Sequence, residues 1–507
     1  MIRTDLVVQT RAAFLRPSVV LGLATLAVHV VGNGGYGFFR DELYFIVCGQ
    51  HPDWGYVDQP PVVPLIAAGF YALFAHSLTL FRLAPGLAMA ATVAATAEFA
   101  RALGGGRPAQ WLAGLCALCA PVLLALGVFY TTDMLQPLFW LMASWCLVKR
   151  IRTGDERWWL GFGAAVGAGL WSKYLIAFYA AALIASLPAT PLRRSLASPW
   201  FYAGALLAVA MIAPNIAWQY RHDWPFLELS QVLSHEKNRA LSPPAFLAQQ
   251  VFAMGPLTVL VWGAGLWGFA ARAPYRPFAI AWVLLVACFI AEHGKANYMA
   301  AIYPVLLAGG AVFWEQRGVR ARLVLGAAIA AEAVAFAPMA MPILPEETII
   351  AYMAALHVGP ALTSAENHIN GRMPQHFGDM HGWPELAEKV AAIYWRLPPR
   401  DRQHAVFYGR NYGDAAAVDL FGRALGLPPA ISPHNNYYLW GPHGADGSVM
   451  ITLGGDPEFR DKAFRSVELA GRTDNPYAQP SEIQPIYVLR GMKPPLAQRW
   501  PKLKRYH

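Results

Sequence analysis

The chain has 507 residues, of which 56% are hydrophobic and only 14% are charged. Soluble proteins carry about 25% charged residues, so the composition excludes an ordinary soluble protein and indicates many membrane spans. The net charge of +9 does not indicate a nucleic-acid-binding surface, because the basic residues are distributed among short segments between apolar runs.

The first 341 residues hold a series of apolar runs, each judged against the roughly 20 residues that a helix needs to cross a bilayer. The first run lacks the Ala-x-Ala site of a cleavable signal peptide, so it is expected to remain as a span. We predict an all-α polytopic membrane protein with about eleven transmembrane helices. The predicted spans cover residues 17–37, 82–100, 109–128, 132–148, 158–172, 174–188, 199–218, 251–270, 277–292, 298–314 and 321–341. The fifth and sixth are short and are expected to be tilted or partly re-entrant.

The five cysteines predict no disulfide framework. Cys48 follows the first span, and the other four lie inside apolar runs. Cys116 and Cys119 have the spacing of a redox motif, but Leu and Ala surround them, so we interpret both as small buried hydrophobic residues.

Basic residues occur in every second segment between the predicted spans. Lys and Arg are enriched in cytoplasmic loops, so these segments and the N-terminus are predicted to be cytoplasmic. The alternate segments, including 38–81 and 219–250, are then predicted to face outward. The basic segments carry Arg3, Arg11, Arg16, Arg101, Arg107, Lys149, Arg150, Arg152, Arg157, Arg193, Arg194, Arg272, Arg276, Arg317, Arg320 and Arg322.

The amino-acid composition of the chain changes after Met341. Residues 342–507 are rich in Pro, Gly, Asn, His and Tyr, and short mixed runs at 404–408 and 447–452 are typical of strands. We therefore predict two domains, a transmembrane catalytic domain at 1–341 with the external segment 38–81, and a small C-terminal α/β domain at 342–507. Because the predicted number of spans is odd, the second domain is expected to be periplasmic in a cell with two membranes.

The segment after the first span is the most informative one in the chain. It reads Phe39-Arg40-Asp41-Glu42-Leu43-Tyr44. Adjacent carboxylates repel each other, so one is expected to have a raised pKa, a metal ion or a cationic partner such as Arg40. A carboxylate here could act as a general base on an acceptor hydroxyl. The alternative is a helix N-terminus, where acidic side chains favour the helix dipole.

Two further aspartates have both a structural and a functional interpretation. Asp58 precedes Pro60-Pro61 and an apolar run to His76 that is typical of a helix on the membrane surface, so it is either a helix cap or part of a site. Asp133 opens the fourth predicted span and either caps that helix or lines a cavity.

Charged side chains within or beside the spans are candidate binding residues. Lys173 interrupts an apolar run and must extend to the interface or pair with an acid. His222 and His235 lie in one outward segment, and with Glu42 and Asp58 they are candidate ligands of a divalent metal ion. No closed ligand set is visible, so no cofactor is predicted with certainty.

The acidic segment resembles a known family. Arg40, Asp41, Glu42 and Tyr44, followed by Trp54, Asp58 and the Pro60-Pro61 pair, resemble the first external loop of the polyprenol-phosphate-sugar-dependent membrane glycosyltransferases. These GT-C fold enzymes include the protein mannosyltransferases and the ArnT-like aminoarabinose transferases (glycosyltransferase family 39). The pattern from Gly294 to Pro304 is similar too. The runs 408–413 and 434–442 look like the tail of one bacterial branch of this group.

The resemblance implies roles for individual residues. The residue that matches Asp41 is the catalytic base in this family, and Glu42 and Asp58 would shape the site or hold a metal ion. One departure is that ArnT-like members have Glu-Lys before the Pro-Pro pair, whereas this chain has Asp58-Gln59, which weakens any assignment to lipid A. Binding of the donor phosphate is expected from cationic and phenolic side chains on the outward face, namely Lys295, Lys173, Arg82, Arg239 and Tyr298. The residues expected to line the cavity are Asp133, Tyr44 and His293.

These features predict an inverting glycosyltransferase (an EC 2.4 enzyme) of the bacterial inner membrane. It would move one sugar from a polyprenyl-phosphate-linked donor to an acceptor hydroxyl of a lipid, glycan or protein at the periplasmic face. The alternatives are a transporter or flippase of a lipid-linked glycan, and a polymerase or ligase of surface polysaccharide. A transporter is expected to place ionisable residues in the middle of spans and to show internal repeats, whereas most charges here lie at span ends.

Overall fold

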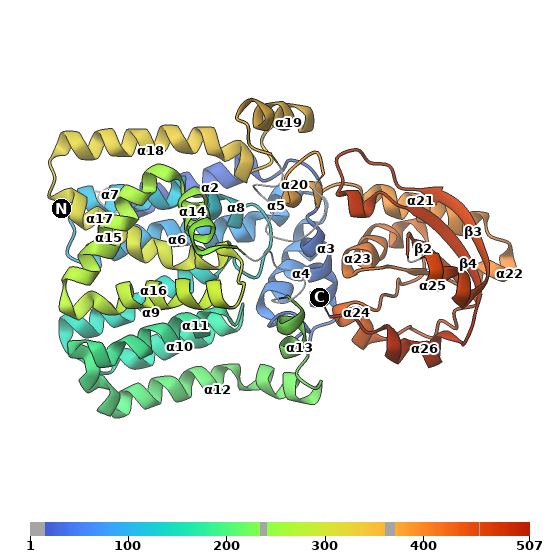
Figure 1. Ribbon diagram of the computed structural model, residues 1–507, viewed down its shortest axis with the longest axis horizontal. Coiled ribbons are helices and arrows are strands. Elements are labelled where there is room, and N and C mark those ends of the chain that lie inside the picture. Colours follow the sequence, from blue (N-terminus) through green and yellow to red (C-terminus); the bar gives the residue numbers. More distant parts are fainter. Residues whose placement is uncertain (1–15, 234–240, 360–370, 456, 507) are drawn as a thin grey trace, which may run out of the picture. The chain divides into compact units, whose positions relative to one another are not determined.

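The computed structural model describes residues 16–233, 241–359, 371–455 and 457–506 (Figure 1). The chain divides into two compact units. The first, called the helical unit here, comprises residues 1–34, 79–218 and 238–343, and the second, called the mixed unit, comprises 35–78, 219–237 and 344–507. The mixed unit therefore combines the acidic segment of the sequence with the C-terminal third of the chain.

The helical unit consists of helices throughout its described residues (Figure 1). Its α-helices are α2 (Pro17–Gly32), α6 (Leu83–Ala102), α7 (Arg107–Cys119), α8 (Pro121–Leu126), α9 (Gln136–Thr153), α10 (Trp158–Leu170), α11 (Leu175–Ser186), α12 (Pro199–Arg221, which continues into the mixed unit), α14 (Pro243–Met254), α15 (Val259–Ala271), α16 (Arg276–Ala291), α17 (Tyr303–Glu315) and α18 (Val319–Ala340). Short 3₁₀ helices join them at Leu187–Ala189 (η1), Pro191–Ala197 (η2), Pro256–Thr258 (η4), Ala273–Tyr275 (η5) and Ala296–Ile302 (η6).

Close helix packing in this unit depends on small residues. Helices α15 and α17 lie side by side, and a Cβ atom added to Gly265 or Gly310 would overlap the backbone of the opposite helix. Membrane helices approach closely in this way because lipid provides no hydrophobic force to drive them together. Cys116 and Cys119 are buried and unbridged in this core, as predicted.

The predicted count of about eleven spans stays a prediction. Five helices within the described residues are long and apolar enough to cross a membrane, or seven if each of two bent pairs forms one span. The bends measure 111° between Leu175–Ala189 and Pro191–Ala197 and 101° between Pro243–Met254 and Pro256–Ala271. The predicted span at 109–128 is divided into α7 and α8. The sixth span, 174–188, was expected to be tilted or partly re-entrant, and the first bend lies at its end. The divisions at Pro121 and Pro256 were not predicted, because hydropathy reports the composition of a run and not the prolines that break it.

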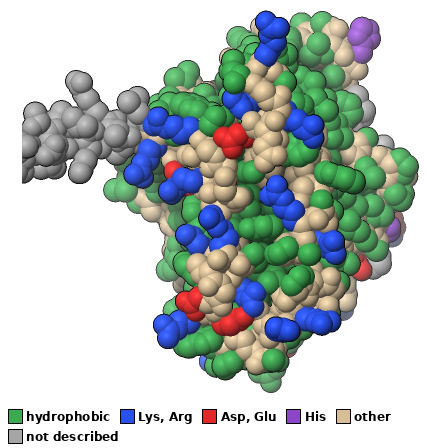
Figure 2. All heavy atoms as spheres, turned by 90° about the vertical axis from the view of Figure 1, so that its left-hand side faces the viewer, with side chains coloured by type: hydrophobic (Ala, Val, Ile, Leu, Met, Phe, Trp, Pro, Cys, Tyr) green, Lys and Arg blue, Asp and Glu red, His purple; other side chains and the backbone are tan. Residues whose placement is uncertain are grey.

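Basic side chains mark helix ends at the segments predicted to be cytoplasmic. Figure 2 shows Lys and Arg side chains spread over one face of the molecule, among hydrophobic ones. Helix α6 carries Arg101 in its last turn and α9 carries Arg150 and Arg152, while α7 and α16 begin at Arg107 and Arg276. The positive-inside rule predicts a cytoplasmic location for helix ends of this kind, and the orientation stays a prediction.

The mixed unit contains helices and a four-stranded sheet (Figure 1). Its helices are α3 (Arg40–Gln50), α4 (Val62–Phe74), α13 (Pro225–Val232), α19 (Glu346–Ala355), α20 (Gln375–Gly378), α21 (Trp383–Arg396), α22 (Pro399–Arg402), α23 (Tyr412–Phe421), α24 (Asn435–Trp440), α25 (Pro457–Ala463) and α26 (Leu496–Leu503), with 3₁₀ helices η8 (Arg423–Leu425) and η9 (Pro480–Glu482). Helix α5 (Leu78–Phe81) lies where the chain passes into the helical unit. The strands are β1 (Ala405–Tyr408), β2 (Val449–Leu453), β3 (Phe464–Arg472) and β4 (Pro485–Met492).

The sheet has the order β1-β2-β4-β3, with β1 parallel to β2 and the other pairs antiparallel. Met450 of β2 lies opposite Leu489 of β4, and both belong to a hydrophobic core with Leu496 and Trp500 of α26. Strand β2 is buried along its whole length, whereas the edge strand β3 is mostly exposed. The segments predicted as strands at 404–408 and 447–452 form β1 and β2.

Helix α23 connects this sheet to the acidic segment within the same unit. Helix α23 contacts strand β1, helix α21 and helix α3. The N-terminus of α3 carries Asp41 and Glu42, and α23 begins at Tyr412. The packing of α23 on α3 therefore brings two segments together that are far apart in the sequence.

Candidate functional site

The site begins at the N-terminus of α3. Phe39 is the N-cap residue, and its backbone N–H donates a hydrogen bond of 2.9 Å to Oε2 of Glu42. Glu42 is fully buried. This carboxylate therefore satisfies one of the amide groups that a helix N-terminus leaves without an intrahelical partner. For Glu42 the alternative interpretation from the sequence, a helix N-terminus, is confirmed.

Asp41 has a different environment. Its Oδ1 atom accepts a 2.8 Å hydrogen bond from the hydroxyl of Tyr412 and lies 3.6 Å from Nε of Arg40. The side chain is 29% exposed, and within the described part of the chain its Oδ2 atom accepts no hydrogen bond. One oxygen is thus held in place while the other is available to a proton.

A second carboxylate, that of Asp58, also accepts a hydrogen bond from a tyrosine hydroxyl. The hydroxyl of Tyr44 donates to Oδ1 of Asp58 at 3.1 Å. The rings of Tyr44 and Tyr412 are stacked, with centroids 4.5 Å apart and planes at 27°. Each of the two stacked tyrosines therefore donates a hydrogen bond to one of the two aspartates. Asp58 is not a helix cap, because α4 begins at Val62 with Pro61 at its N-cap and no side-chain cap.

Asn436 of α24 fixes the segment before Asp58. Its Oδ1 atom accepts a 2.7 Å hydrogen bond from the backbone N–H of Val57, and its own backbone N–H donates to the hydroxyl oxygen of Tyr44 at 3.3 Å. The preceding residue, Asn435, has a left-handed backbone with φ of 46°, a conformation that Asn tolerates better than most residues. From the other side, Nε2 of Gln219 donates to the carbonyl of Tyr56 at 3.1 Å.

The two tyrosines remain hydrogen-bond donors throughout the physiological pH range. Burial raises the pKa of Tyr44 well above its ordinary value, and Asp58 raises it further. Burial likewise raises the pKa of Tyr412; Arg40 opposes this shift, and Asp41 adds to it. Neither phenol loses its proton at neutral pH, so each can only donate to its aspartate.

Arg40 supplies the positive charge near Asp41. Its Nη1 atom lies 3.7 Å from Oδ1 of the buried Asp379, and its guanidinium carbon lies 5.7 Å from the centre of the Tyr412 ring. A Cβ atom on Gly413 would lie 2.5 Å from Cγ of Arg40, so only glycine lets α23 approach this side chain so closely. Arg40 is thus the cationic partner that the sequence suggested, shared between two aspartates.

The helical unit brings together a second group of predicted residues. Nζ of Lys173 lies 2.7 Å from Oδ2 of Asp133 and 4.6 Å from the centre of the Tyr298 ring. Lys173 therefore pairs with an acid, one of the two outcomes expected for it. The interpretation of Asp133 as a helix cap is wrong, because α9 begins at Gln136 with Leu135 at its N-cap and no side-chain hydrogen bond.

The other cationic candidates differ in their burial and in their contacts. Arg82 is fully buried, and its Nη1 atom donates to the carbonyl of Asn33 at 2.9 Å. Lys295 is the N-cap residue of η6 and is half-buried, and His293 is exposed with φ of 50°. Arg239 lies outside the described residues.

The candidate metal ligands form no closed set among the described residues, and the metal site stays a prediction. Within the described residues there is no group of three or more His, Cys, Asp or Glu side chains that could hold a metal ion. Glu42 caps α3, Asp58 accepts from Tyr44, and His222 does not complete a set with them. His235 lies outside the described residues.

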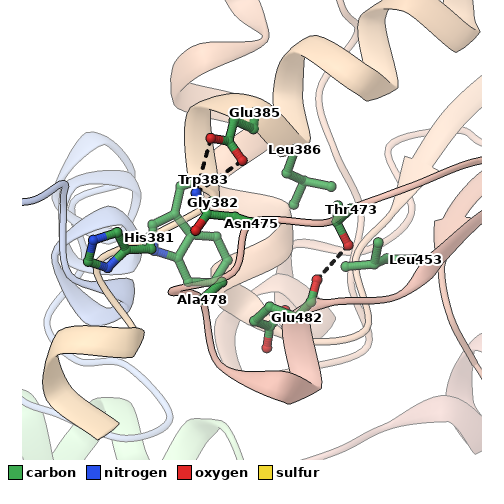
Figure 3. Close-up of a pocket in the computed structure, with 10 residues that line it drawn as sticks. All are labelled: His381, Gly382, Trp383, Glu385, Leu386, Leu453, Thr473, Asn475, Ala478 and Glu482. Carbon is green, nitrogen blue, oxygen red and sulfur yellow. Dashed lines mark hydrogen bonds between the residues drawn. The ribbon is translucent and has the colours of Figure 1, made fainter. Parts of the chain in front are cut away.

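A small cavity in the mixed unit is not a substrate site (Figure 3). It lies between α21 and the segment around Thr473 and has a volume of about 10 Å³. That volume is about enough for one water molecule, so a sugar does not fit. The polar groups around it bond to protein, for example Asn475 Nδ2 to Oε1 of Glu385 at 3.0 Å.

The residues that hold the aspartates were not predicted from the sequence. Tyr412 and Asn436 lie in the two runs noted for their resemblance to one bacterial branch, but no role was assigned to them. Their contacts with the acidic segment join residues 371 and 392 positions apart. The density of Tyr, Asn and His in these runs was the available signal.

Comparison with known proteins places these features in a class. Residues 58–218 match the sequence model of the family described as dolichyl-phosphate-mannose-protein mannosyltransferase. The match covers less than half of the chain. The predicted resemblance to GT-C fold membrane glycosyltransferases is confirmed as a similarity, by this match and by the shared fold described next. No curated protein sequence matches the chain significantly.

The fold is shared with ArnT from Cupriavidus metallidurans. The apo crystal structure of that protein aligns with a TM-score of 0.60 and 15% identity, over 94% of this chain and 98% of that chain. Its structure bound to undecaprenyl phosphate aligns with a TM-score of 0.59 and 16% identity, over 93% and 97%. The predicted multi-pass membrane protein is therefore confirmed.

Proposed function

We propose that this protein is an inverting glycosyltransferase that moves a single sugar from a polyprenyl-phosphate-linked donor to an acceptor hydroxyl. The observation that carries the proposal is the geometry of Asp41, a partly exposed carboxylate with Oδ1 held by Tyr412 and Oδ2 open. The family match and the shared fold with ArnT, which binds undecaprenyl phosphate in one of its structures, support the choice of donor.

In the proposed reaction Asp41 acts as the general base. Its Oδ2 atom accepts the proton of the acceptor hydroxyl as that oxygen attacks the anomeric carbon of the sugar. The bond between the anomeric carbon and the phosphate oxygen breaks, and its electron pair leaves with the lipid phosphate. A single displacement of this kind inverts the anomeric configuration. The proton on Asp41 then passes to solvent.

Cationic side chains are proposed to stabilise the departing phosphate. Lys295 and Lys173 are the candidates with partly accessible side chains, and Tyr298 lies against the ammonium group of Lys173. A lysine acts on phosphate as a point charge and strengthens the interaction as negative charge develops on the leaving group. Arg82 is buried against the carbonyl of Asn33, which favours a structural role for it.

The reaction is proposed to take place at the outer face of the inner membrane. The basic helix ends at Arg101, Arg107 and Arg150 favour a cytoplasmic location for their segments. The acidic segment follows α2 on the side away from the cytoplasmic N-terminus, so it would be periplasmic. The acceptor is proposed to be a lipid, glycan or protein in that compartment.

Replacement of the proposed base tests this function. Purified protein in detergent would be given synthetic polyprenyl-phosphate sugar and a panel of hydroxyl acceptors, with hydrolysis of the donor as a second readout. Asp41→Asn keeps the size of the side chain but cannot accept the proton, so transfer is expected to fall by about 10²–10⁴-fold. Donor binding is expected to stay within a few-fold of wild type.

Asp53→Asn is the matched control, because Asp53 is an exposed carboxylate of the same segment whose Oδ1 atom accepts from the backbone of Trp54 at 2.7 Å. It is expected to retain wild-type transfer. Near-wild-type transfer by Asp41→Asn would shift the base assignment to Asp58 or Asp133. Movement of the lipid donor across a bilayer without any sugar transfer would instead support a flippase.

A further inference from the structure

We propose that Tyr412, from the C-terminal part of the chain, is the positioning residue that holds Asp41 in the orientation needed for proton transfer. This inference rests on the proposed function, in which Asp41 is the base. It goes beyond that function because it assigns part of the catalytic geometry to helix α23, more than 300 residues away in the sequence.

The hydrogen bond from Tyr412 selects which oxygen of Asp41 is open. The Tyr412 hydroxyl donates to Oδ1 at 2.8 Å, while the nearest atom of Arg40 lies 3.6 Å from the same oxygen. In the described part of the chain these two groups are the polar partners of the Asp41 carboxylate, and both lie at Oδ1. Without the phenol, the carboxylate could rotate about its χ2 angle, a broad torsion with low barriers.

Tyr412 is itself held from several directions. Its ring stacks on Tyr44 with centroids 4.5 Å apart and on His434 with centroids 4.8 Å apart. Its backbone N–H donates to Nδ1 of His434 at 3.2 Å, so a neutral His434 carries its proton on Nε2. Asn411 caps the same helix, since its side chain accepts from the backbone of Asp414 at 2.9 Å. A phenol fixed in this way orients its partner without losing further entropy.

The segment that contains His434 is held by backbone hydrogen bonds to Arg505. The backbone N–H of Asn435 donates to the carbonyl of Arg505 at 3.0 Å, and Arg505 donates back to Pro433 at 2.9 Å. His434 lies between these two contacts and has an exposed fraction of 3%. A series of hydrogen bonds therefore runs from Arg505 through the segment of His434 and through Tyr412 to Asp41.

The variant Tyr412→Phe removes the hydroxyl and keeps the ring. We expect kcat to fall about 10- to 100-fold, the usual effect of losing a hydrogen bond to a charged group. The donor KM should change less than threefold. A purely structural tyrosine would lower the folded yield and would not produce this separation between kcat and KM.

Tyr437→Phe is the matched control. Tyr437 is also fully buried in the mixed unit, and its hydroxyl also donates to a carboxylate, Oδ2 of Asp419, at 2.6 Å. Its loss should leave kcat near the wild-type value. If Tyr412→Phe keeps the wild-type kcat, or if both variants lower kcat equally, the positioning role is wrong.

A double-mutant cycle separates this inference from the proposed function. Tyr412→Phe and Asp41→Asn would be combined and thermal unfolding measured for all four proteins, together with transfer. Loss of transfer in Asp41→Asn with normal kinetics in Tyr412→Phe overturns the inference and leaves the function standing. Full transfer by Asp41→Asn overturns the base assignment itself. Additive changes in unfolding temperature would show that the two side chains are not coupled, which also overturns the inference.

Discussion

Asp41 and Glu42 are neighbours in the sequence, but the start of helix α3 gives them different surroundings. Glu42 occupies the third helical position, from which its carboxylate reaches back to the N–H of Phe39 and is buried. Asp41 stands one position earlier and contacts Tyr412. Repulsion between the two charges is reduced because an amide group donates to Glu42, while a phenol and a guanidinium group both lie at Oδ1 of Asp41. Their positions in the first turn of α3 therefore account for their different surroundings.

The pair formed by Lys173 and Asp133 is expected to matter for stability. The side chains are 22% and 14% exposed, so removal of either partner leaves a poorly solvated charge. Lys173→Met and Asp133→Asn should each lower the free energy of unfolding by about 1–3 kcal/mol, less than the 3–5 kcal/mol of fully buried pairs.

The measurement is thermal unfolding in detergent, and the double variant provides the comparison. It should be less destabilised than the sum of the two single variants, because it leaves no lone charge. If the effects add, the 2.7 Å contact contributes no coupling to stability.

At the scale of elements, apolar runs predicted helices well and bends poorly. The helix expected between Pro61 and His76 is α4, Val62–Phe74, and its location on the membrane surface stays a prediction. The breaks at Pro121 and Pro256 divide runs of uniform hydropathy, and composition alone does not show them. The pairing of α23 with α3 was not predicted either, because a contact across 371 residues has no local pattern. Asp41, Tyr44 and Asp58 were predicted because they share one short segment.

The close approach of α23 to α3 gives a prediction at this scale. In Gly413→Ala the new methyl group would lie 2.5 Å from Cγ of Arg40, an atom near the backbone that cannot easily move aside. We expect a loss of about 1–3 kcal/mol in the free energy of unfolding, as in other overpacked sites, and reduced transfer.

Gly69→Ala is the control for this substitution. Gly69 lies in α4 of the same unit, and a Cβ atom there would meet nothing within 4 Å. Alanine favours a helix over glycine by about 1 kcal/mol, so this variant should be at least as stable as the wild type. Equal destabilisation of both variants would contradict the contact between Gly413 and Arg40.

At the scale of the whole molecule, the charge distribution predicts its orientation. Alkaline phosphatase fused after residue 345 is expected to be active, because the chain beyond Ile343 belongs to the unit that carries the acidic segment. The same reporter fused near residue 155, beside Arg150 and Arg152, should be inactive. The reverse pattern would place Asp41 in the cytoplasm and contradict the proposed donor.

The long sequence separation between Asp41 and Tyr412 also orders events during synthesis. A ribosome adding about 5–20 residues per second needs roughly 20–75 s to travel the 371 positions between them. During that time Asp41 exists without the phenol that orients it. Because Arg505 secures the segment that supports Tyr412, a chain cut short by premature termination would insert into the membrane with an unsupported base. Completion of translation therefore becomes a condition for full activity under the proposed function, because incomplete copies would lack the residue that orients Asp41.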